Sequence, residues 1–288
     1  MRFHDRPDGV LLTKLSRFRK MWPFMMPSRM EAAVYTSRRV RLHSLQTWLN
    51  RINANREDKL TLFHVILASA VRMLALQPDL NRFVAGRRIY QRRTIDISFV
   101  TRRELTEQST ETIVKMTFDP YSTLETVAEQ VNASIRTTKK SKSSHDEKMS
   151  NLITLLPRFM IRSLIRAGRI LDYFGFLPAA YIKKDSMFAS IFIANLGSIN
   201  LDAILHPMFE WGNASCFIVI GKRKKEPMIN DRDEIHVEEV MDVTFTLDHR
   251  ITGGFNFSQA ILTVKEMINN PDELLKKPEN LPDPFVMA

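Results

Sequence analysis

The segment from residue 240 to residue 257 constrains the fold of this chain more than any other stretch. Apolar and polar residues alternate over Met241–Leu247, which is the period-2 pattern of a strand buried on one face. An Asp-His-Arg sequence with His249 at its centre follows, then two glycines, and residues 255–268 have the spacing of a helix. We therefore expect a strand, a tight polar turn and a helix, with one histidine presented at the end of a rigid strand.

The rest of the chain mixes helices with strands that can pair as hairpins. Helices are predicted over residues 44–52, where a serine would cap the first turn, and over residues 62–76 and 122–137. Strands are predicted over residues 34–42, 83–84, 89–90, 95–101, 112–118, 188–194 and 215–221, and the charged segments 138–148 and 222–234 are predicted to be a loop and a turn. Because helices and strands do not alternate strictly, this order indicates an α/β protein of the α+β type, with a mixed β-sheet and flanking helices.

Residues 151–176 are predicted to form one basic amphipathic helix. Its arginines are spaced 4, 4 and 3 residues apart, which places them on one helical face: Arg158, Arg162, Arg166 and Arg169. Such a helix can cap a domain with a solvated arginine face, or it can lie on an anionic membrane or an acidic partner. The sequence leaves these alternatives open.

The charge balance favours an anionic partner. Lysine and arginine number 42 against 32 aspartates and glutamates, which gives a net charge of +10 and a pI near 9.8. Nucleic acid, an anionic membrane surface and a phosphorylated ligand all fit this charge. Nucleic acid is the weakest of the three because the sequence contains no recognisable nucleic-acid-binding module.

Cysteine usage and the N-terminal sequence indicate a reducing compartment. Cys216 is the only cysteine, so the sequence has neither a disulfide framework nor a cysteine-rich metal site. The first residues lack the apolar core of a signal peptide, and no stretch reaches the roughly 20 apolar residues that span a bilayer. A cytoplasmic protein is expected. No metal is expected either, because His236 and His249 lie in one strand region without a carboxylate signature.

The strand, turn and helix around His249 resemble the catalytic signature of the 2-oxo-acid dehydrogenase acyltransferase family. This family includes the dihydrolipoyl acyltransferases and is related to chloramphenicol acetyltransferase. Its pattern is a histidine, three residues, an aspartate and a glycine. Here His249 is followed after three residues by Gly253, in place of the aspartate, and then by Gly254.

Other segments resemble the family in the same order along the chain. They occupy residues 59–72, 78–86, 95–99 and 194–197, and the resemblance extends from about Leu15 to Leu274. It implies a chloramphenicol-acetyltransferase-like fold for one domain over residues 1–288. An N-terminal arm over residues 1–30 and an insertion over residues 138–187, the loop plus the basic helix, would be attached to that domain.

The resemblance implies transfer of an acyl group between coenzyme A and a thiol or hydroxyl acceptor. His249 would be the general base, because an imidazole with a pKa near 6.5 suits proton transfer at neutral pH. The family carries a hydroxyl residue where this chain has Ala194, so the amide of the next residue, Asn195, is the candidate oxyanion donor. Asp248 and Arg250 are expected to supply contacts that compensate for Gly253.

The resemblance also implies partners. A homotrimer is expected, in which the histidine and the oxyanion donor come from different subunits. The chain would carry no lipoyl group, so the acceptor is a small molecule or a lipoyl group on a separate protein. The family pairs an arginine near Leu15–Lys20 with the motif aspartate, which is absent here. The alternative that remains open is a non-catalytic binding or scaffold subunit, placed at a membrane surface by the basic helix, because it accounts directly for Gly253 and Ala194.

Overall fold

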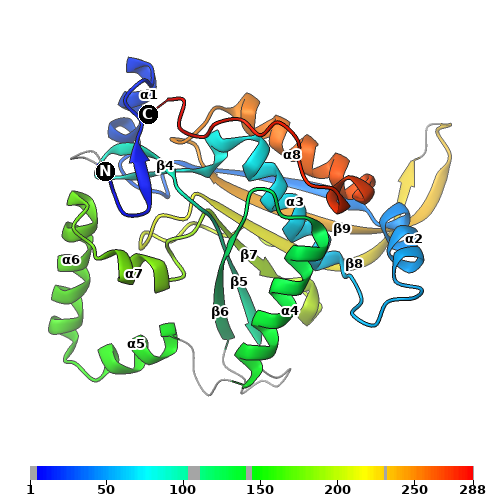
Figure 1. The fold of residues 1–288 in the computed structure, drawn as a ribbon, viewed down its shortest axis with the longest axis horizontal. Coiled ribbons are helices and arrows are strands. Elements are labelled where there is room, and N and C mark those ends of the chain that lie inside the picture. The colour runs from blue at the N-terminus through cyan, green and yellow to red at the C-terminus, as the bar shows by residue number, and fades with distance from the viewer. Residues whose placement is uncertain (1–4, 103–110, 141–144, 230–231, 288) are drawn as a thin grey trace.

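A six-stranded mixed sheet forms the centre of the molecule (Figure 1). The computed structural model describes residues 5–102, 111–140, 145–229 and 232–287. The strands follow the order β2 (Ala33–Arg41), β9 (Ile235–Asp248), β8 (Cys216–Ile229), β7 (Ile191–Asn195), β5 (Ile95–Arg102) and β6 (Glu111–Phe118). β7 is parallel to both of its neighbours, and the other pairings are antiparallel. The predicted mixed sheet is confirmed.

Helices cover one face of this sheet and enclose the main core (Figure 1). They are α2 (His43–Ile52), α3 (Leu62–Leu76), α4 (Leu124–Lys140) and α8 (Gly254–Asn269). α3 is central and is buried without interruption from His64 to Ala75. Its first turn is closed by a capping box, in which Thr61 Oγ1 accepts from the His64 backbone N–H and His64 Nδ1 accepts from the Thr61 N–H.

α2 begins differently from its prediction. The expected serine cap is wrong, because the helix starts at His43 and its N-cap residue, Leu42, offers no side-chain cap. Instead, α2 is stabilised by the burial of Leu45, Trp48 and Leu49 against the core.

A smaller antiparallel sheet lies beside the large one. Its order is β1 (Gly9–Leu11), β4 (Arg88–Arg92) and β3 (Arg82–Ala85), so the predicted hairpin is confirmed. After β1 the chain forms α1 (Arg17–Met25), whose N-cap is Ser16. Short 3₁₀ helices connect other elements: η1 (Pro78–Asn81), η2 (Leu196–Ile199) and η3 (Pro271–Leu275).

The predicted single helix over residues 151–176 is wrong. The chain forms α5 (His145–Thr154), α6 (Arg158–Phe174) and α7 (Ala179–Lys184), and Pro157 separates the first two as the N-cap residue of α6. Proline has no backbone N–H to continue a helix. The loop predicted over residues 138–148 is also wrong at both ends, because α4 extends to Lys140 and α5 begins at His145. Residues 141–144 lie outside the described residues.

α6 is attached to the body mainly through its C-terminal half. Asp172 Oδ1 lies 2.7 Å from Arg6 Nη2, and Gly168 packs so closely on Trp211 that an added Cβ would lie 2.8 Å from the indole ring. No residue of α6 is buried. Within the described residues, no helix is long and apolar enough to cross a bilayer.

The predicted turn over residues 222–234 is wrong. β8 continues to Ile229, β9 begins at Ile235, and the two strands remain paired in register from Arg223–Met241 to the tip. The result is a two-stranded ribbon that extends past the helix layer (Figure 1). Because charged residues occupy this ribbon, the local sequence has the composition of a turn although its backbone is paired.

Candidate functional site

His249 lies in the turn directly after β9, between the ends of two other segments. Its backbone N–H donates to the Ala32 carbonyl at 2.8 Å, and the N–H of Asp248 donates to the Ser215 carbonyl at 2.9 Å. These bonds fix the end of β9 between its neighbours β2 and β8. The histidine side chain is partly exposed, so a ligand can reach it.

A buried ion pair holds the inside of the turn. Arg250 Nε and Nη2 donate to the two carboxylate oxygens of Asp248 at 2.8 and 2.7 Å, and the Arg250 backbone N–H donates to Asp248 Oδ1 at 3.0 Å. Asp248 is 1% exposed and Arg250 is 4% exposed. Arg250 Nη1 also donates to the Met26 carbonyl at 3.1 Å. Asp248 and Arg250 therefore contact each other, and the pair directs Arg250 into the protein.

A second anchor holds the far side of the turn. Asp79 Oδ2, in η1, accepts hydrogen bonds from Thr252 Oγ1 at 2.5 Å and from Asn256 Nδ2 at 2.6 Å. Thr252 precedes the helix and Asn256 lies in the first turn of α8, so one carboxylate joins the turn to the helix that follows it. Sequence reasoning missed Asp79. It lies inside the family-like segment 78–86, but no local pattern distinguishes it from a solvated aspartate of a turn.

α1 covers the imidazole of His249. The ring centroids of Trp22 and His249 are 4.5 Å apart, with planes inclined at 48°. The Arg19 guanidinium lies over the Trp22 ring, with Cζ 4.2 Å from the ring centroid. Arg19 Nη1 also donates to the His249 carbonyl at 3.4 Å. The segment Leu15–Lys20 therefore contributes to this site, as the resemblance implied.

Arg19 also lies beside the position where the family has its aspartate. A Cβ built on Gly253 would be 3.5 Å from Arg19 Nη2. Gly253 has φ −86° and ψ 161°, a conformation that any L-residue adopts. The backbone therefore does not require glycine at this position, and the arginine has no carboxylate partner there.

The surroundings of His249 favour the neutral imidazole. Burial lowers the pKa of His249 below its ordinary value, the positive charge of Arg19 lowers it further, and the nearby Asp248 opposes the shift. Among the described residues, no hydrogen bond to either ring nitrogen of His249 is present. Packing against Trp22, rather than a hydrogen bond, orients the ring in this chain.

Asn195 lies far from His249 within one chain. It ends β7, where its register partner is Ile220 of β8, and Ile220 is paired with Val243 of β9. His249 follows Val243 by six residues, which at about 3.3 Å per residue is a separation of roughly 20 Å. A single subunit therefore does not bring the predicted base and the predicted oxyanion donor together.

Asn195 lines a polar hollow of its own. The hollow, about 420 Å³, is also lined by Thr61, Ser198 and Asn200. Ala194 instead packs in an apolar cluster with Phe192. Ala194, at the position of the family's hydroxyl residue, thus has apolar surroundings, whereas Asn195, the candidate substitute donor, faces a polar hollow.

Thiol nucleophilicity and metal coordination can also be compared with the structure. Burial raises the pKa of the Cys216 thiol to about 12, so this cysteine is not a nucleophile at neutral pH. In the part of the chain that the structure describes, no group of three or more His, Cys, Asp or Glu side chains is arranged to hold a metal ion.

Comparison with known proteins identifies relatives of this chain. Residues 182–276 match the family of 2-oxoacid dehydrogenases acyltransferase (catalytic domain). A dihydrolipoyllysine-residue acetyltransferase component of the pyruvate dehydrogenase complex from Rickettsia bellii is 30% identical over 86 residues, which are 29% of this chain and 19% of that protein. The match thus spans about a fifth of the length of the relative.

Solved structures resemble the chain over nearly its whole length. A probable dihydrolipoamide acetyltransferase from Listeria monocytogenes superposes with a TM-score of 0.59 and 14% identity, covering 93% of this chain and 97% of that one. A chloramphenicol acetyltransferase superposes with a TM-score of 0.53 and 10% identity, covering 90% and 99%. The fold predicted from the sequence is confirmed, and so is the recognised resemblance.

Proposed function

We propose that this chain, whose residues 182–276 match the 2-oxoacid dehydrogenases acyltransferase (catalytic domain) family, transfers an acyl group between coenzyme A and a thiol or hydroxyl acceptor. The observation that carries the proposal is His249, which lies at a strand end in a turn fixed from both sides by Asp248–Arg250 and by Asp79. The turn is held without the family's aspartate, so the histidine keeps a defined position.

His249 acts as the general base in the proposed reaction. Its neutral imidazole takes the proton of the acceptor S–H or O–H while the acceptor attacks the acyl carbonyl. The tetrahedral intermediate then collapses, the bond to the coenzyme A sulfur breaks, and the imidazolium returns the proton to that sulfur. The lowered pKa of His249 supports this role because the unprotonated form is present at neutral pH. Arg250 contributes by positioning, through its pair with Asp248.

The active unit is proposed to be a homotrimer with sites between subunits. The separation of His249 from Asn195 within one chain supports this arrangement, because a second subunit could bring its own Asn195 close to His249. Asn195 would then donate its amide to the oxyanion. The net charge of +10 suits coenzyme A, and the acceptor is a small molecule or a lipoyl group on a separate protein.

Release of free coenzyme A from a panel of acyl-CoAs tests the proposal, with dihydrolipoamide and simple hydroxyl compounds as acceptors. Wild type is compared with His249→Ala, and His43→Ala is the control because His43 is an exposed histidine of α2. Acceptor-dependent turnover that only His249→Ala abolishes is the expected result. No turnover and no coenzyme A binding across the panel would refute the enzyme assignment.

Two further measurements test the subunit arrangement. Asn195→Ala is expected to lower kcat by about 10²- to 10³-fold, the usual effect of deleting one oxyanion donor. An unchanged kcat would remove Asn195 from the site and leave the assignment of His249 intact. A stable monomer at micromolar concentration, measured by light scattering, would contradict the shared site.

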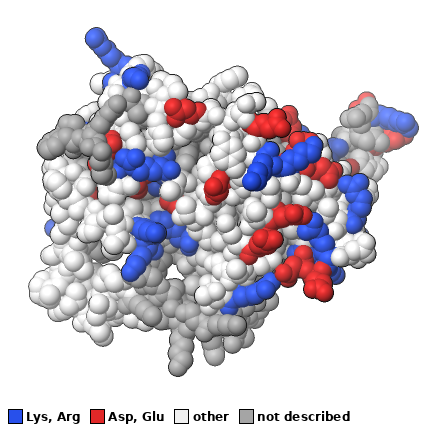
Figure 2. Space-filling model, viewed as in Figure 1, with Lys and Arg blue, Asp and Glu red and all other residues white. Residues whose placement is uncertain are grey.

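A second candidate function is attachment of the chain to an anionic membrane surface as a non-catalytic subunit. α6 favours it, because its apolar residues Phe159, Leu164, Ile170 and Phe174 are 71, 48, 58 and 62% exposed. Figure 2 agrees, since the left side of the molecule, where α6 runs in Figure 1, shows few charged groups in this view.

The arginines of α6 strengthen this second candidate. Among the described residues, none of the four arginines takes part in an ion pair, so they are available to lipid headgroups. Co-sedimentation with phosphatidylserine vesicles tests the candidate, comparing wild type with a variant that carries glutamine at all four positions. Equal binding of the two proteins, or none by either, would rule it out.

A further inference from the structure

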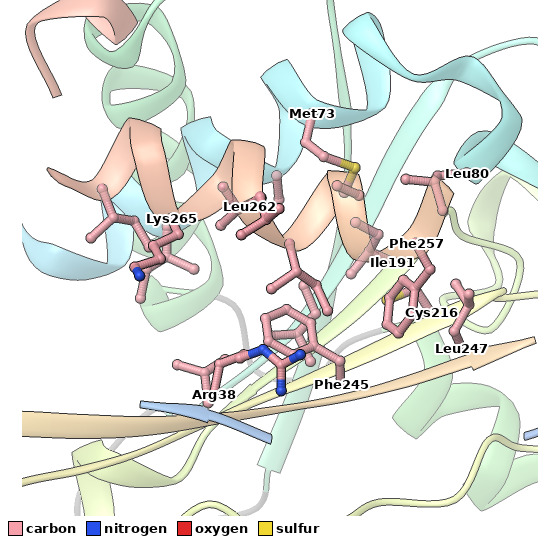
Figure 3. A pocket seen from close by; sticks show the side chains of 18 of the residues that line it. Arg38, Met73, Leu80, Ile191, Cys216, Phe245, Leu247, Phe257, Leu262 and Lys265 are labelled. Atoms are coloured by element: carbon pink, nitrogen blue, oxygen red, sulfur yellow. The ribbon is translucent and has the colours of Figure 1, made fainter. Parts of the chain in front are cut away.

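We infer that an apolar cavity between α8 and the sheet binds a short straight-chain carboxylate, with the tail inside and the anionic head at a basic mouth (Figure 3). This inference does not depend on the proposed acyl transfer, because His249 is not among the residues that line the cavity.

The cavity lies between the helix layer and the sheet and has a volume of about 150 Å³. α3 and α8 form its roof, and β2, β9, β8 and β7 form its floor. Its apolar wall includes Met73, Leu80, Ile191, Phe245, Leu247 and Phe257. An apolar cavity of about this size stays dry and accommodates a group as large as benzene. The space therefore suits a hydrocarbon segment rather than a peptide element.

The charged residues of the lining are all basic. They are Arg38, Arg39 and Lys265, and among the residues that the structure describes no aspartate or glutamate lines the cavity. Figure 3 shows the Arg38 guanidinium on the sheet side and the Lys265 ammonium on the helix side of the opening. Cations from opposite walls thus face one apolar space, and this pattern is complementary to an anion that carries an apolar tail.

Within the described residues, two of these cations take part in no ion pair and can therefore pair with an anionic ligand. Arg39 is already paired with Asp242 and Glu226. Arg38 has the same side-chain direction as Val40, because alternate residues of a strand share a face. Its Nη1 donates to Thr36 Oγ1 and to the Ser37 carbonyl, and to no carboxylate in the described part of the chain. Lys265 forms no ion pair with any residue that the structure describes. A carboxylate at the mouth would therefore form ion pairs with both Arg38 and Lys265.

A carboxylate fits this opening better than a bulkier anionic head group. Arginine binds a planar carboxylate through two parallel hydrogen bonds, and a lysine on the opposite wall adds a third donor. The tail contributes through burial, so affinity should rise about fourfold for each methylene that enters the cavity. Once the apolar space is filled, further methylenes remain in solvent and the affinity should level off.

The experiment is calorimetric titration of the full chain with straight-chain carboxylates of increasing length and with the matching alcohols, each below its micelle concentration. The double variant Arg38→Gln/Lys265→Gln is expected to bind the carboxylates about tenfold more weakly and to bind the alcohols as wild type does. The control is Arg88→Gln/Lys277→Gln, which removes the same charge from exposed positions outside the cavity. The control should bind like wild type.

A second variant tests the cavity itself. Ala260 of α8 is 3% exposed and lines the cavity, so Ala260→Leu is expected to fill the space and abolish binding of both acids and alcohols. Ala70→Leu, from the α3 side, replaces it if thermal unfolding shows that the first variant does not fold. Carboxylate binding that is independent of chain length, that survives the filling variant or that is unchanged in Arg38→Gln/Lys265→Gln would overturn the inference.

Discussion

Restoring an aspartate at position 253 is the perturbation whose outcome the structure defines most closely. Arg19 Nη2 lies 3.5 Å from where the new Cβ would be, and Gly253 already has an ordinary backbone conformation. The carboxylate of Gly253→Asp can therefore reach the guanidinium without movement of the backbone. Gly253 is also the N-cap residue of α8 and makes no side-chain cap at present. The variant should consequently gain stability from more than one source.

The separate contributions can be worked out with a matched variant. Gly253→Asn gains a side-chain cap and loses unfolded-state entropy, which together stabilise the chain by about 0.5–1 kcal/mol. Gly253→Asp adds an ion pair with a partly exposed Arg19, a contribution of about 0.5–1 kcal/mol. Each kcal/mol raises Tm by roughly 2–4 °C in a domain somewhat smaller than this chain, so Gly253→Asp should unfold about 2 °C above Gly253→Asn.

The titration of His249 supplies a second, independent measurement. Arg19 helps to lower the pKa of His249 in the wild type. A carboxylate beside Arg19 offsets that charge, so Gly253→Asp should raise the pKa of His249 and Gly253→Asn should leave it in place. Both Tm by calorimetry and the histidine titration by NMR should be repeated in an Arg19→Gln background, where the difference attributed to the pair disappears. Equal Tm values and equal titrations for the Asp and Asn variants would refute the assignment of Arg19 as the partner of position 253.

Three other outcomes are expected. Arg250→Met removes the guanidinium that pairs with the buried Asp248 carboxylate and should cost about 3–5 kcal/mol in urea unfolding, whereas a loss below about 1 kcal/mol would show that the pair does not hold the turn. The pKa of His249 is lowered in the folded protein, so below about pH 6.5 the unfolded chain binds more protons than the folded one, and the free energy of unfolding decreases as pH falls. His249→Gln should flatten that part of the pH–stability curve measured by denaturant unfolding. Cys216, which is buried and has a pKa near 12, should resist alkylation in the native protein at pH 8, and modification within minutes, measured by mass spectrometry, would contradict its burial.

Local sequence patterns predicted the elements that are stabilised by local interactions or by the burial of one face. α3 has the bounds expected from its apolar spacing, and β9 with the turn at His249 and α8 follows the predicted order. The ribbon beyond Ile220 could not be predicted in the same way, because its strands are held by pairing with each other rather than by an apolar face. The break at Pro157 carried a signal, since proline disfavours helix interiors, but the apolar spacing on both sides outweighed it.

The site was predictable in its centre and not in its surroundings. His249 follows from a strand pattern that ends in a polar turn, and its partners Asp248 and Arg250 are adjacent in sequence. Asp79 and Trp22 approach from segments more than 150 residues away, so only the folded chain places them at the turn. The distance between His249 and Asn195 likewise depends on strand register, which residue patterns do not specify.

Because of the way α6 is attached, this chain should have two cooperative unfolding events: local opening of α6 and global unfolding. Its contacts with the body include Gly168, Asp172 and Tyr173, it has no buried residue, and Pro157 and Gly175 bound it at both ends. A segment with so little buried surface can open without the unfolding of the rest. In native-state hydrogen exchange, amides of α6 should exchange through such local openings, whereas those of α3 should be protected up to the free energy of global unfolding. The chain would then keep an intact core while α6 leaves and rejoins it.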